Sequence, residues 1–99
     1  KTIITKCSTL GNNSKWVFKH SDNLKNGNIL IRDFEKGVWR KYCENNLVIN
    51  EDSFSCDNGS MILVDFVSME LTQKITFFPV GKEPLVYKRT FYCDKLKNP

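Results

Sequence analysis

Four cysteines, spread across almost the whole chain, constrain the fold more than any other feature: Cys7, Cys43, Cys56 and Cys93. None of them forms a Cys-x-x-Cys pair, so the ligand spacing of zinc ribbons and the redox motif of thioredoxins are both absent. A zinc site built from all four cysteines is geometrically possible, but structural zinc sites usually have closely spaced ligand pairs. We therefore expect two intramolecular disulfides and maturation in an oxidising compartment, either periplasmic or secretory.

Three pairings of four cysteines are possible, and the sequence alone leaves them open. We favour a nested arrangement, in which Cys7–Cys93 joins the two ends of the chain and Cys43–Cys56 closes a short loop in its middle. The alternative, Cys7–Cys43 with Cys56–Cys93, has nearly equal spans and would suit two hairpin-like halves. In the chain-entropy model the long loop contributes about 4–5 kcal/mol to stability and the short loop about 3 kcal/mol.

The length of the chain, 99 residues, corresponds to one domain, residues 1–99. Hydrophobic residues make up 40% of it, which is enough for a core and too much for a disordered chain. The formal net charge is +4, a mildly basic balance. No apolar run approaches the roughly 18 residues of a transmembrane helix, so we expect no membrane span. The chain begins at Lys1 rather than at methionine, and we interpret it as a mature or trimmed form that has lost any signal peptide or lipid anchor.

Short runs of β-branched and aromatic residues recur along the chain, and turns rich in Asn, Asp, Gly and Ser separate them. No segment keeps a sustained helical period of apolar residues. The runs predict strands at Thr2–Cys7, Lys15–His20, Asn28–Phe34, Val38–Cys43, Leu47–Asn50, Ser53–Cys56, Met61–Met69, Leu71–Val80 and Leu85–Cys93. Trp16 and Phe18 share one face of their strand, and so do Leu71, Ile75 and Phe77. In the last run one face, which we expect to point inward, is formed by Leu85, Tyr87, Phe91 and Cys93. Arg89 interrupts that face, so either the strand bends there or Arg89 lies at a rim. The run 61–69 is apolar on both faces, which indicates a central strand.

Asn-Gly pairs are strong hairpin signals, and they occur at Asn26-Gly27 and Asn58-Gly59. Six to nine short strands separated by such turns predict an all-β domain. We expect an antiparallel meander, closed into a small barrel or folded into a sandwich and held by two disulfides. An α+β fold with a short helix at Asp33–Glu44 is the alternative, but Gly37 and the Val38-Trp39 pair make a poor helix interior.

Few residues are suited to catalysis. Histidine most often performs acid–base work at neutral pH, and the only one, His20, lies in Lys19-His20-Ser21-Asp22 at the expected end of a strand. A His–Ser–Asp arrangement there is disfavoured, because neighbouring residues at one strand end do not easily converge on one reacting atom. The motifs of serine hydrolases and of phosphate-binding loops are absent. We therefore expect a protein that is not an enzyme and that holds no cofactor and no metal.

Acidic residues add little, because most of them lie in expected turns. Asp65 interrupts the most apolar run, where we favour an edge-facing or cross-strand paired carboxylate over a buried functional acid. Asp57-Asn58-Gly59-Ser60 lacks the length and the terminal Glu of a calcium loop, so we interpret it as a turn. Asn12 and Asn58 begin Asn-x-Ser triplets, which are glycosylation acceptors in a secretory pathway.

Lysines and arginines form small groups among aromatic residues, as they do in grooves that bind single-stranded nucleic acid. Strand alternation explains this interleaving without a ligand, and disulfides argue against a cytosolic RNA-binding protein, so we expect no nucleic-acid partner. The cations expected near loop ends are the candidate contacts with a protein partner: Lys36, Arg40, Lys82 and Arg89.

Two segments of the second half carry a resemblance to a known family. They are Cys56-Asp57-Asn58-Gly59, which precedes a long apolar strand, and Glu83-Pro84-Leu85-Val86-Tyr87-Lys88-Arg89, which is followed by Cys93 and Leu96-Lys97-Asn98-Pro99. They resemble bacterial periplasmic inhibitors of c-type lysozyme. The resemblance implies a disulfide-bonded barrel of eight strands that inserts a loop into the carboxylate-bearing cleft of a muramidase. The Ser-Gly-x-x-Tyr loop of that family is absent here, so no inhibitory residue carries over.

These observations predict a non-enzymatic extracytoplasmic binding protein, an inhibitor or an immunity protein against a lytic enzyme such as a muramidase or a bacteriocin. A small basic domain would complement the acidic cleft of such an enzyme. Two other classes are the alternatives. A structural or adhesin-type module would self-associate or pair by strand addition. A single-stranded nucleic-acid binder would show affinity that falls steeply with salt.

Overall fold

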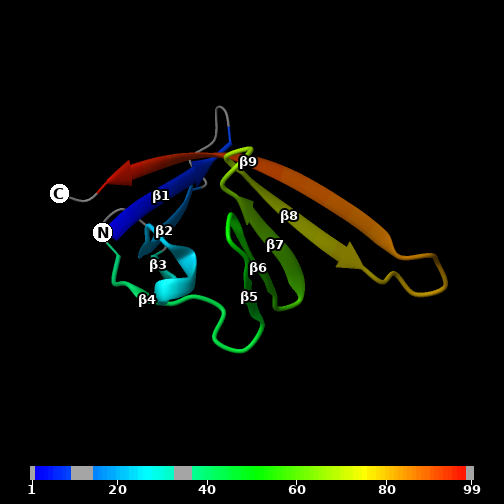
Figure 1. Ribbon diagram of the computed structural model, residues 1–99. Coiled ribbons are helices and arrows are strands. Elements are labelled where there is room, and N and C mark those ends of the chain that lie inside the picture. Colours follow the sequence, from blue (N-terminus) through cyan, green and yellow to red (C-terminus); the bar gives the residue numbers. More distant parts are fainter. Residues whose placement is uncertain (1, 10–14, 33–36, 98–99) are drawn as a thin grey trace.

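Antiparallel strands form one sheet in the computed structural model, which describes residues 2–9, 15–32 and 37–97 (Figure 1). The nine strands in these ranges are β1 (Thr2–Ser8), β2 (Lys15–Ser21), β3 (Leu30–Arg32), β4 (Arg40–Lys41), β5 (Leu47–Ile49), β6 (Ser53–Asp57), β7 (Ser60–Asp65), β8 (Glu70–Phe77) and β9 (Leu85–Lys97). One 3₁₀ turn, η1 (Leu24–Asn26), interrupts them. The all-β prediction is confirmed, and β4 occupies part of the segment where a helix was the alternative.

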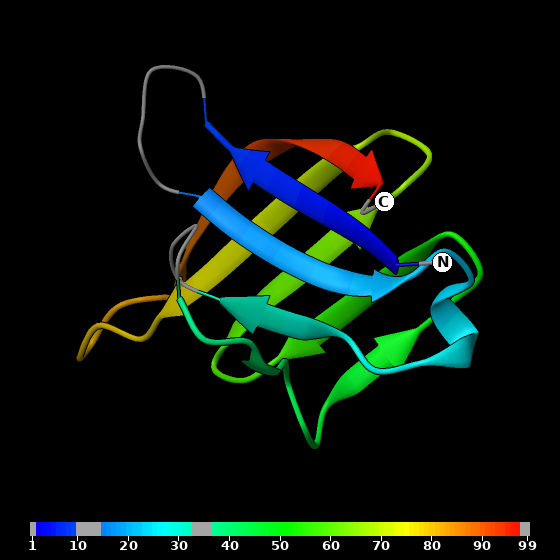
Figure 2. The ribbon, with the colours of Figure 1, turned by 90° about the vertical axis from the view of Figure 1, so that its left-hand side faces the viewer.

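The sheet has the strand order β4-β3-β2-β1-β9-β8-β7-β6-β5, so the first and last strands meet at its centre. It curls on itself, and Figure 2 shows β1, β2 and β3 lying in front of β6, β7 and β8. The two edge strands, β4 and β5, do not pair with each other. The molecule is therefore a half-barrel, which corrects the expected closed barrel. The physical reason is that β4 and β5 have only two and three residues, too few for a closing ladder.

The nested disulfide arrangement is confirmed. Cys7 and Cys93 lie directly opposite each other on β1 and β9, with their Cα atoms 4.0 Å apart. Cys43 follows β4 at one edge of the sheet and bonds to Cys56 on β6, next to the other edge. No described cysteine is free, so neither the zinc site nor the alternative pairing is formed. The first bridge joins the two halves of the sheet at its centre, and the second joins them across the open side.

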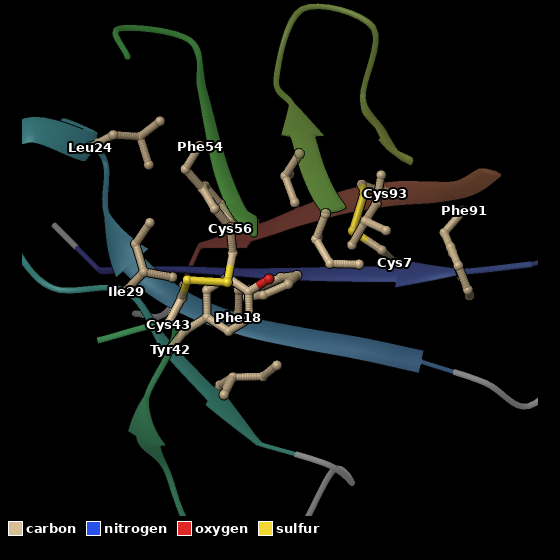
Figure 3. Packing of buried hydrophobic residues seen from close by; sticks show 14 residues of the cluster. Cys7, Phe18, Leu24, Ile29, Tyr42, Cys43, Phe54, Cys56, Phe91 and Cys93 are labelled. Atoms are coloured by element: carbon tan, nitrogen blue, oxygen red, sulfur yellow. A yellow bond between two sulfur atoms is a disulfide. The ribbon is translucent and has the colours of Figure 1, made fainter. Parts of the chain in front are cut away.

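Aromatic rings fill the space between the two halves of the sheet (Figure 3). Phe18 of β2 packs edge-on against Tyr42 and against Phe54 of β6, at ring-centroid distances of 5.2 and 5.1 Å. Trp16 stacks on Phe18 at 6.1 Å, which confirms that these two residues share a face. The core therefore holds together strands that share no ladder hydrogen bonds.

The run 61–69 is not one strand, because β7 ends at Asp65 and a turn separates it from β8. The Asp65 carboxylate accepts hydrogen bonds from the backbone N–H groups of Val67 and Ser68, at 2.8 and 3.4 Å. Met69 then adopts a positive φ of 58° and completes the reversal. Asp65 is half-buried and stabilises this turn, so it is neither a buried functional acid nor only a cross-strand partner. Flanked by β6 and β8, β7 is interior to the sheet, as expected for the first part of the run.

The two Asn-Gly pairs behave differently. Asn58-Gly59 lies in the hairpin turn between β6 and β7, where Gly59 has a φ of 91° that favours glycine. Asn26-Gly27 is not a hairpin turn, because Asn26 ends η1 and Gly27 is extended. The side chain of Asn23 accepts a hydrogen bond from the backbone N–H of Lys25 and caps η1. Because Leu24 is buried in the core, it anchors this wider connection.

Candidate functional site: a projecting hairpin

The hairpin of β8 and β9 extends beyond the strands on either side of it. On one side β7 pairs with β8 only as far as Ile75, and on the other β1 pairs with β9 only from Tyr92 onward. Among the described strands, residues 75–91, which we call the arm, therefore have no ladder partner outside the β8–β9 hairpin, apart from Ile75 at its base. Figure 1 shows the arm projecting away from the half-barrel. An element that projects in this way is a candidate contact surface.

The inner face of the arm carries an apolar patch made of Ile75, Phe77, Leu85 and Tyr87. These residues are paired across the hairpin, Ile75 with Tyr87 and Phe77 with Leu85, so all four share one face. Phe77, Leu85 and Tyr87 are 52%, 49% and 54% exposed. They line a shallow depression of about 540 Å³. Contiguous exposed apolar side chains of this kind mark interaction surfaces more often than isolated ones do.

The patch lies on the same side of the sheet as the buried core. Leu71 and Phe91 belong to the same alternating set on β8 and β9, and both are almost completely buried. Further along the hairpin the same alternation continues, but Phe77, Leu85 and Tyr87 are about half exposed there. The sequence therefore predicted the inward orientation of Leu85 and Tyr87 correctly, and missed that they remain exposed.

Phe77 was expected to share a face with Leu71 and Ile75, but no sequence observation identified it as part of a surface site. One available signal was the apolar run Phe77-Phe78 before Pro79, followed by the exposed Val80. A soluble hairpin tip is usually polar. Apolar residues leading into a turn therefore could have indicated a contact surface rather than a core strand.

Cations surround the patch and outnumber acids on the arm. Lys82 lies at the tip beside Glu83, and Lys88 and Arg89 lie on β9, all of them exposed. The guanidinium of Arg89 lies 5.3 Å from the centroid of the Phe91 ring. Arg89 thus sits where the buried and exposed parts of the inner face meet, which agrees with the expectation of a cation at a rim.

Of the four candidate contact residues, two lie on the arm. Lys82 and Arg89 are at its tip and its base. Arg40 lies elsewhere, on the edge strand β4, which β3, β2 and β1 separate from β9. There it lines a separate cavity of about 450 Å³ together with Lys41 and Tyr42. Lys36 lies outside the described residues, as does the triplet beginning at Asn12.

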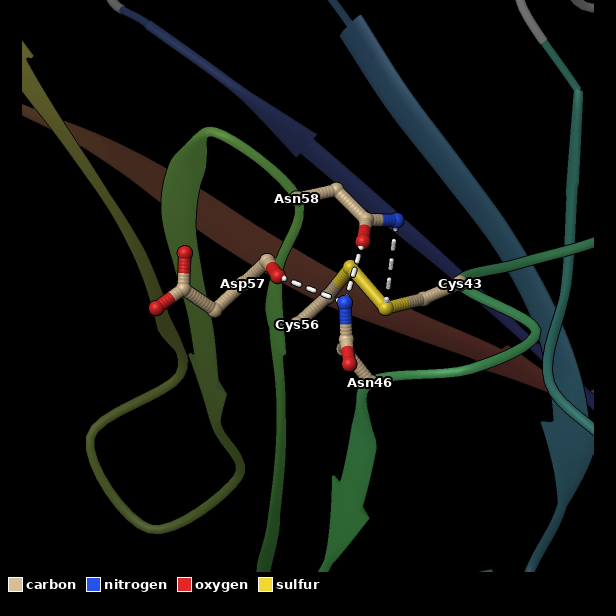
Figure 4. The surroundings of a disulfide bond; sticks show 5 residues. All are labelled: Cys43, Asn46, Cys56, Asp57 and Asn58. Carbon is tan, nitrogen blue, oxygen red and sulfur yellow. Dashed lines mark hydrogen bonds between the residues drawn. A yellow bond between two sulfur atoms is a disulfide. The ribbon is translucent and has the colours of Figure 1, made fainter.

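The surroundings of the second disulfide are a polar network (Figure 4). The side-chain amide of Asn46 donates to the backbone carbonyl of Asp57 at 3.0 Å and to the side-chain oxygen of Asn58 at 2.7 Å. The Asn58 amide nitrogen lies 3.6 Å from the sulfur of Cys43. The turn at Asp57-Asn58-Gly59-Ser60 is thus confirmed, and its side chains attach it to the segment after β4.

His20 is buried and both of its ring nitrogens are engaged. Nδ1 donates to the backbone carbonyl of Ser21 at 2.9 Å, and Nε2 accepts from the hydroxyl of Thr5 at 2.7 Å. Burial lowers the pKa of His20 below 6.5, against the opposing effect of the Ser21 hydrogen bond. The ring is therefore part of the buried interior, where its centroid lies 5.2 Å from that of the Phe66 ring.

Within residues 2–9, 15–32 and 37–97, no three His, Cys, Asp or Glu side chains gather as a metal site would require. Nor does this part of the chain contain a helix with the length and apolar character needed to cross a membrane.

Comparisons with known proteins do not add a relative to these observations. No protein-family model, no curated protein and no solved structure matches this chain.

Proposed function

We propose that this protein is a non-enzymatic binding protein that acts outside the cytoplasm and blocks a lytic enzyme, such as a muramidase, with its arm. The observation that carries the proposal is the exposed apolar patch on a projecting hairpin. An exposed patch of this kind is costly to keep in water and is stabilised when a partner covers it. The arm is also the part of the described surface that extends furthest from the body (Figure 1).

The construction of the arm supports a blocking role. Its two strands keep one uninterrupted register from Glu70–Tyr92 to Phe77–Leu85. Phe77 and Tyr87 pack edge to face across it, with ring centroids 5.5 Å apart. A hairpin that is already ordered loses little conformational entropy on binding, and such preorganisation favours tight inhibitors.

The charge of the arm supports the class of partner. Residues 75–91 contain Lys82, Lys88 and Arg89 but only one acid, Glu83. Glycosidases carry a pair of carboxylates in their cleft, and a muramidase therefore presents negative charge where an inhibitor must enter. Complementary charge speeds association and suppresses wrong partners. The two disulfides agree with a protein that works in an oxidising space.

The test is inhibition of cell-wall lysis by a panel of c-type, g-type and phage-type muramidases, together with co-elution of each enzyme with the protein. We expect at least one enzyme to be inhibited at micromolar excess. The double variant Phe77→Ser with Tyr87→Ser should weaken that inhibition by about 1,000-fold, because two aromatic anchors that each contribute about 2 kcal/mol together contribute about 4 kcal/mol.

The matched control is Val38→Ser with Val48→Ser, which removes two apolar side chains that are 86% and 55% exposed and lie outside the arm. This control should inhibit as the wild type does. If no enzyme of the panel is inhibited or co-elutes, the muramidase proposal is wrong. If inhibition is found but both double variants retain it, the inhibition does not depend on the arm, and that part of the proposal is wrong.

A further inference from the structure

One edge of β9 is open along the arm. β1 pairs with β9 from Ile3–Lys97 to Ser8–Tyr92, and β9 begins at Leu85. The stretch Leu85–Phe91 therefore has β8 on one side and, among the described residues, no strand on the other. The edges of β4 and β5 are much shorter. Short edge strands are a common protection against further pairing, and the β9 edge lacks that protection.

The backbone groups that face this open edge follow from the ladder. The N–H of Cys93 donates to the carbonyl of Met69, at 2.9 Å, and so points toward β8. In antiparallel pairs the direction of the backbone groups alternates from residue to residue. The uninterrupted register between β8 and β9 then places the N–H and C=O groups of Tyr87 and Arg89 toward β8.

The groups left facing outward belong to three residues, Val86, Lys88 and Thr90. The Cys7–Cys93 pair agrees with this assignment, because its Cα separation of 4.0 Å is that of a closely spaced pair without mutual hydrogen bonds. All three side chains are exposed. The edge thus offers a row of backbone donors and acceptors to an added strand.

Charge along this edge indicates which strand it would accept. Lys88 lies directly opposite Lys74 of β8 on the outer face, and both are exposed. Like charges directly opposite each other in a sheet are unfavourable. Arg89, the next residue, adds a third positive charge on the inner face. The neighbouring positions Val86 and Tyr87 are apolar.

We propose that the edge of β9 from Leu85 to Phe91 binds an extended acidic segment of the partner protein by strand addition. The added strand runs antiparallel to β9 and continues the line of β1. Its acidic side chains face Lys88 and Arg89, and its apolar side chains face Val86 and Tyr87. The inference deepens the proposed function and rests on it, because it names how the arm holds its partner.

A second copy of this chain is a less favourable occupant of the edge. A symmetric pairing centred on Lys88 would place two Lys88 side chains opposite each other, each beside its own Lys74. Such a pairing would add like charges to a row that is already positive. An acidic strand instead neutralises that row.

The probe is a synthetic peptide, acetyl-Thr-Glu-Glu-Val-Val-Thr-amide, added to the intact disulfide-bonded protein. Amide hydrogen exchange is followed residue by residue by NMR. We expect new protection at the amides of Val86, Lys88 and Thr90. The amides of Tyr87 and Arg89 already point toward β8 and should not change. This alternating pattern distinguishes strand addition from packing of the peptide against the apolar patch.

A charge exchange tests the proposed chemistry of the partner. Lys88→Glu should weaken binding of the acidic peptide by about tenfold or more and should favour the matched peptide with two lysines in place of the two glutamates. Lys25→Glu is the control. This lysine is exposed on η1, outside the arm, so the variant makes the same change in net charge away from the paired stretch and should leave the affinity within about twofold.

The inference is wrong if the acidic peptide does not bind, if the protection does not alternate, or if Lys88→Glu leaves the preference for the acidic peptide unchanged. Self-association through the same amides in the absence of peptide would also overturn it, in favour of a second copy. These results are separate from the muramidase test. If the protein inhibits an enzyme through its arm but the peptide tests fail, the proposed function stands and only strand addition is rejected. Alternating protection supports the edge site even if no enzyme of the panel is inhibited.

Discussion

At the scale of single residues, the hydroxyl of Tyr42 is the clearest mismatch between a side chain and its surroundings. The residue is buried, and its hydroxyl has no hydrogen-bond partner among the described residues. Burial raises the pKa of Tyr42 to about 12. The ring, by contrast, is well placed, because it contacts Phe18 and Phe54 edge-on. The ring and the hydroxyl should therefore make opposite contributions to stability.

We expect Tyr42→Phe to leave the free energy of unfolding unchanged or to raise it by up to about 1 kcal/mol, because it removes an unpaired buried polar atom. Tyr42→Ala should lower it by about 3–5 kcal/mol through loss of the ring contacts. Urea unfolding of both variants measures this difference. A loss of more than about 1 kcal/mol in Tyr42→Phe would mean that the hydroxyl makes a hydrogen bond after all.

His20 should make stability depend on pH. Burial is the main cause of its lowered pKa and the charge of Lys95 adds to it, while the Ser21 carbonyl and Asp22 act in the opposite direction. The unfolded state, with the ordinary value of 6.5, then binds the proton more readily than the folded state does. Stability contributed by the neutral ring is therefore present above the unfolded pKa and is lost as the pH falls through 6.5 toward the folded pKa.

Urea unfolding across about pH 5.5–7.5, where the carboxylates remain largely ionised, measures this effect. The wild type should become less stable toward the acidic end, and His20→Gln should show a flatter profile. Equal slopes for the two proteins would show that His20 does not control the pH dependence.

At the scale of elements, the sequence was sufficient to predict that the strands exist and which side chains share a face. Alternation correctly placed Trp16 and Phe18 on one face. The run 61–69 reads as apolar on both faces, but only one of its faces is buried: Ile62 and Val64 are buried, whereas Met61 and Leu63 are partly exposed. The ends of the strands were harder to predict. The turn after Asp65, for example, depends on hydrogen bonds that this one carboxylate accepts from backbone N–H groups. A period of two cannot reveal such a turn inside an apolar run.

The candidate site shows a second limit. Alternation assigned Leu85 and Tyr87 to the inner face, and that assignment is confirmed. Whether an inner face is buried depends on what lies opposite, which is a property of the strand order and of relative strand length. Neither the strand order nor the relative strand length can be predicted from the alternation of side chains. Lys82 and Arg89 were expected to contact a protein partner. Both lie on the arm, and their contact with a partner stays a prediction.

At the scale of the whole molecule, closure of the half-barrel depends on side chains rather than on a ladder. The edge strands β4 and β5 are unpaired with each other, and the open side is crossed by the Cys43–Cys56 bond and by the ring contact between Tyr42 and Phe54. The other bridge, Cys7–Cys93, lies between strands that are already held together by backbone hydrogen bonds. The two disulfides therefore have different structural roles.

Removing each bridge separately should reveal those roles. Cys7→Ala with Cys93→Ala opens a loop with a sequence separation of 86 and should lower the free energy of unfolding by about 4–5 kcal/mol. Cys43→Ala with Cys56→Ala opens one of 13 and should lower it by about 3 kcal/mol. Only the second pair should speed amide exchange selectively in β4 and β5, because these edges lose their covalent tie, whereas the ladder still holds β1 to β9. Urea unfolding and residue-resolved hydrogen exchange measure the two effects. If exchange in β4 and β5 is equally fast in both variants, the Cys43–Cys56 bond is not what closes the half-barrel.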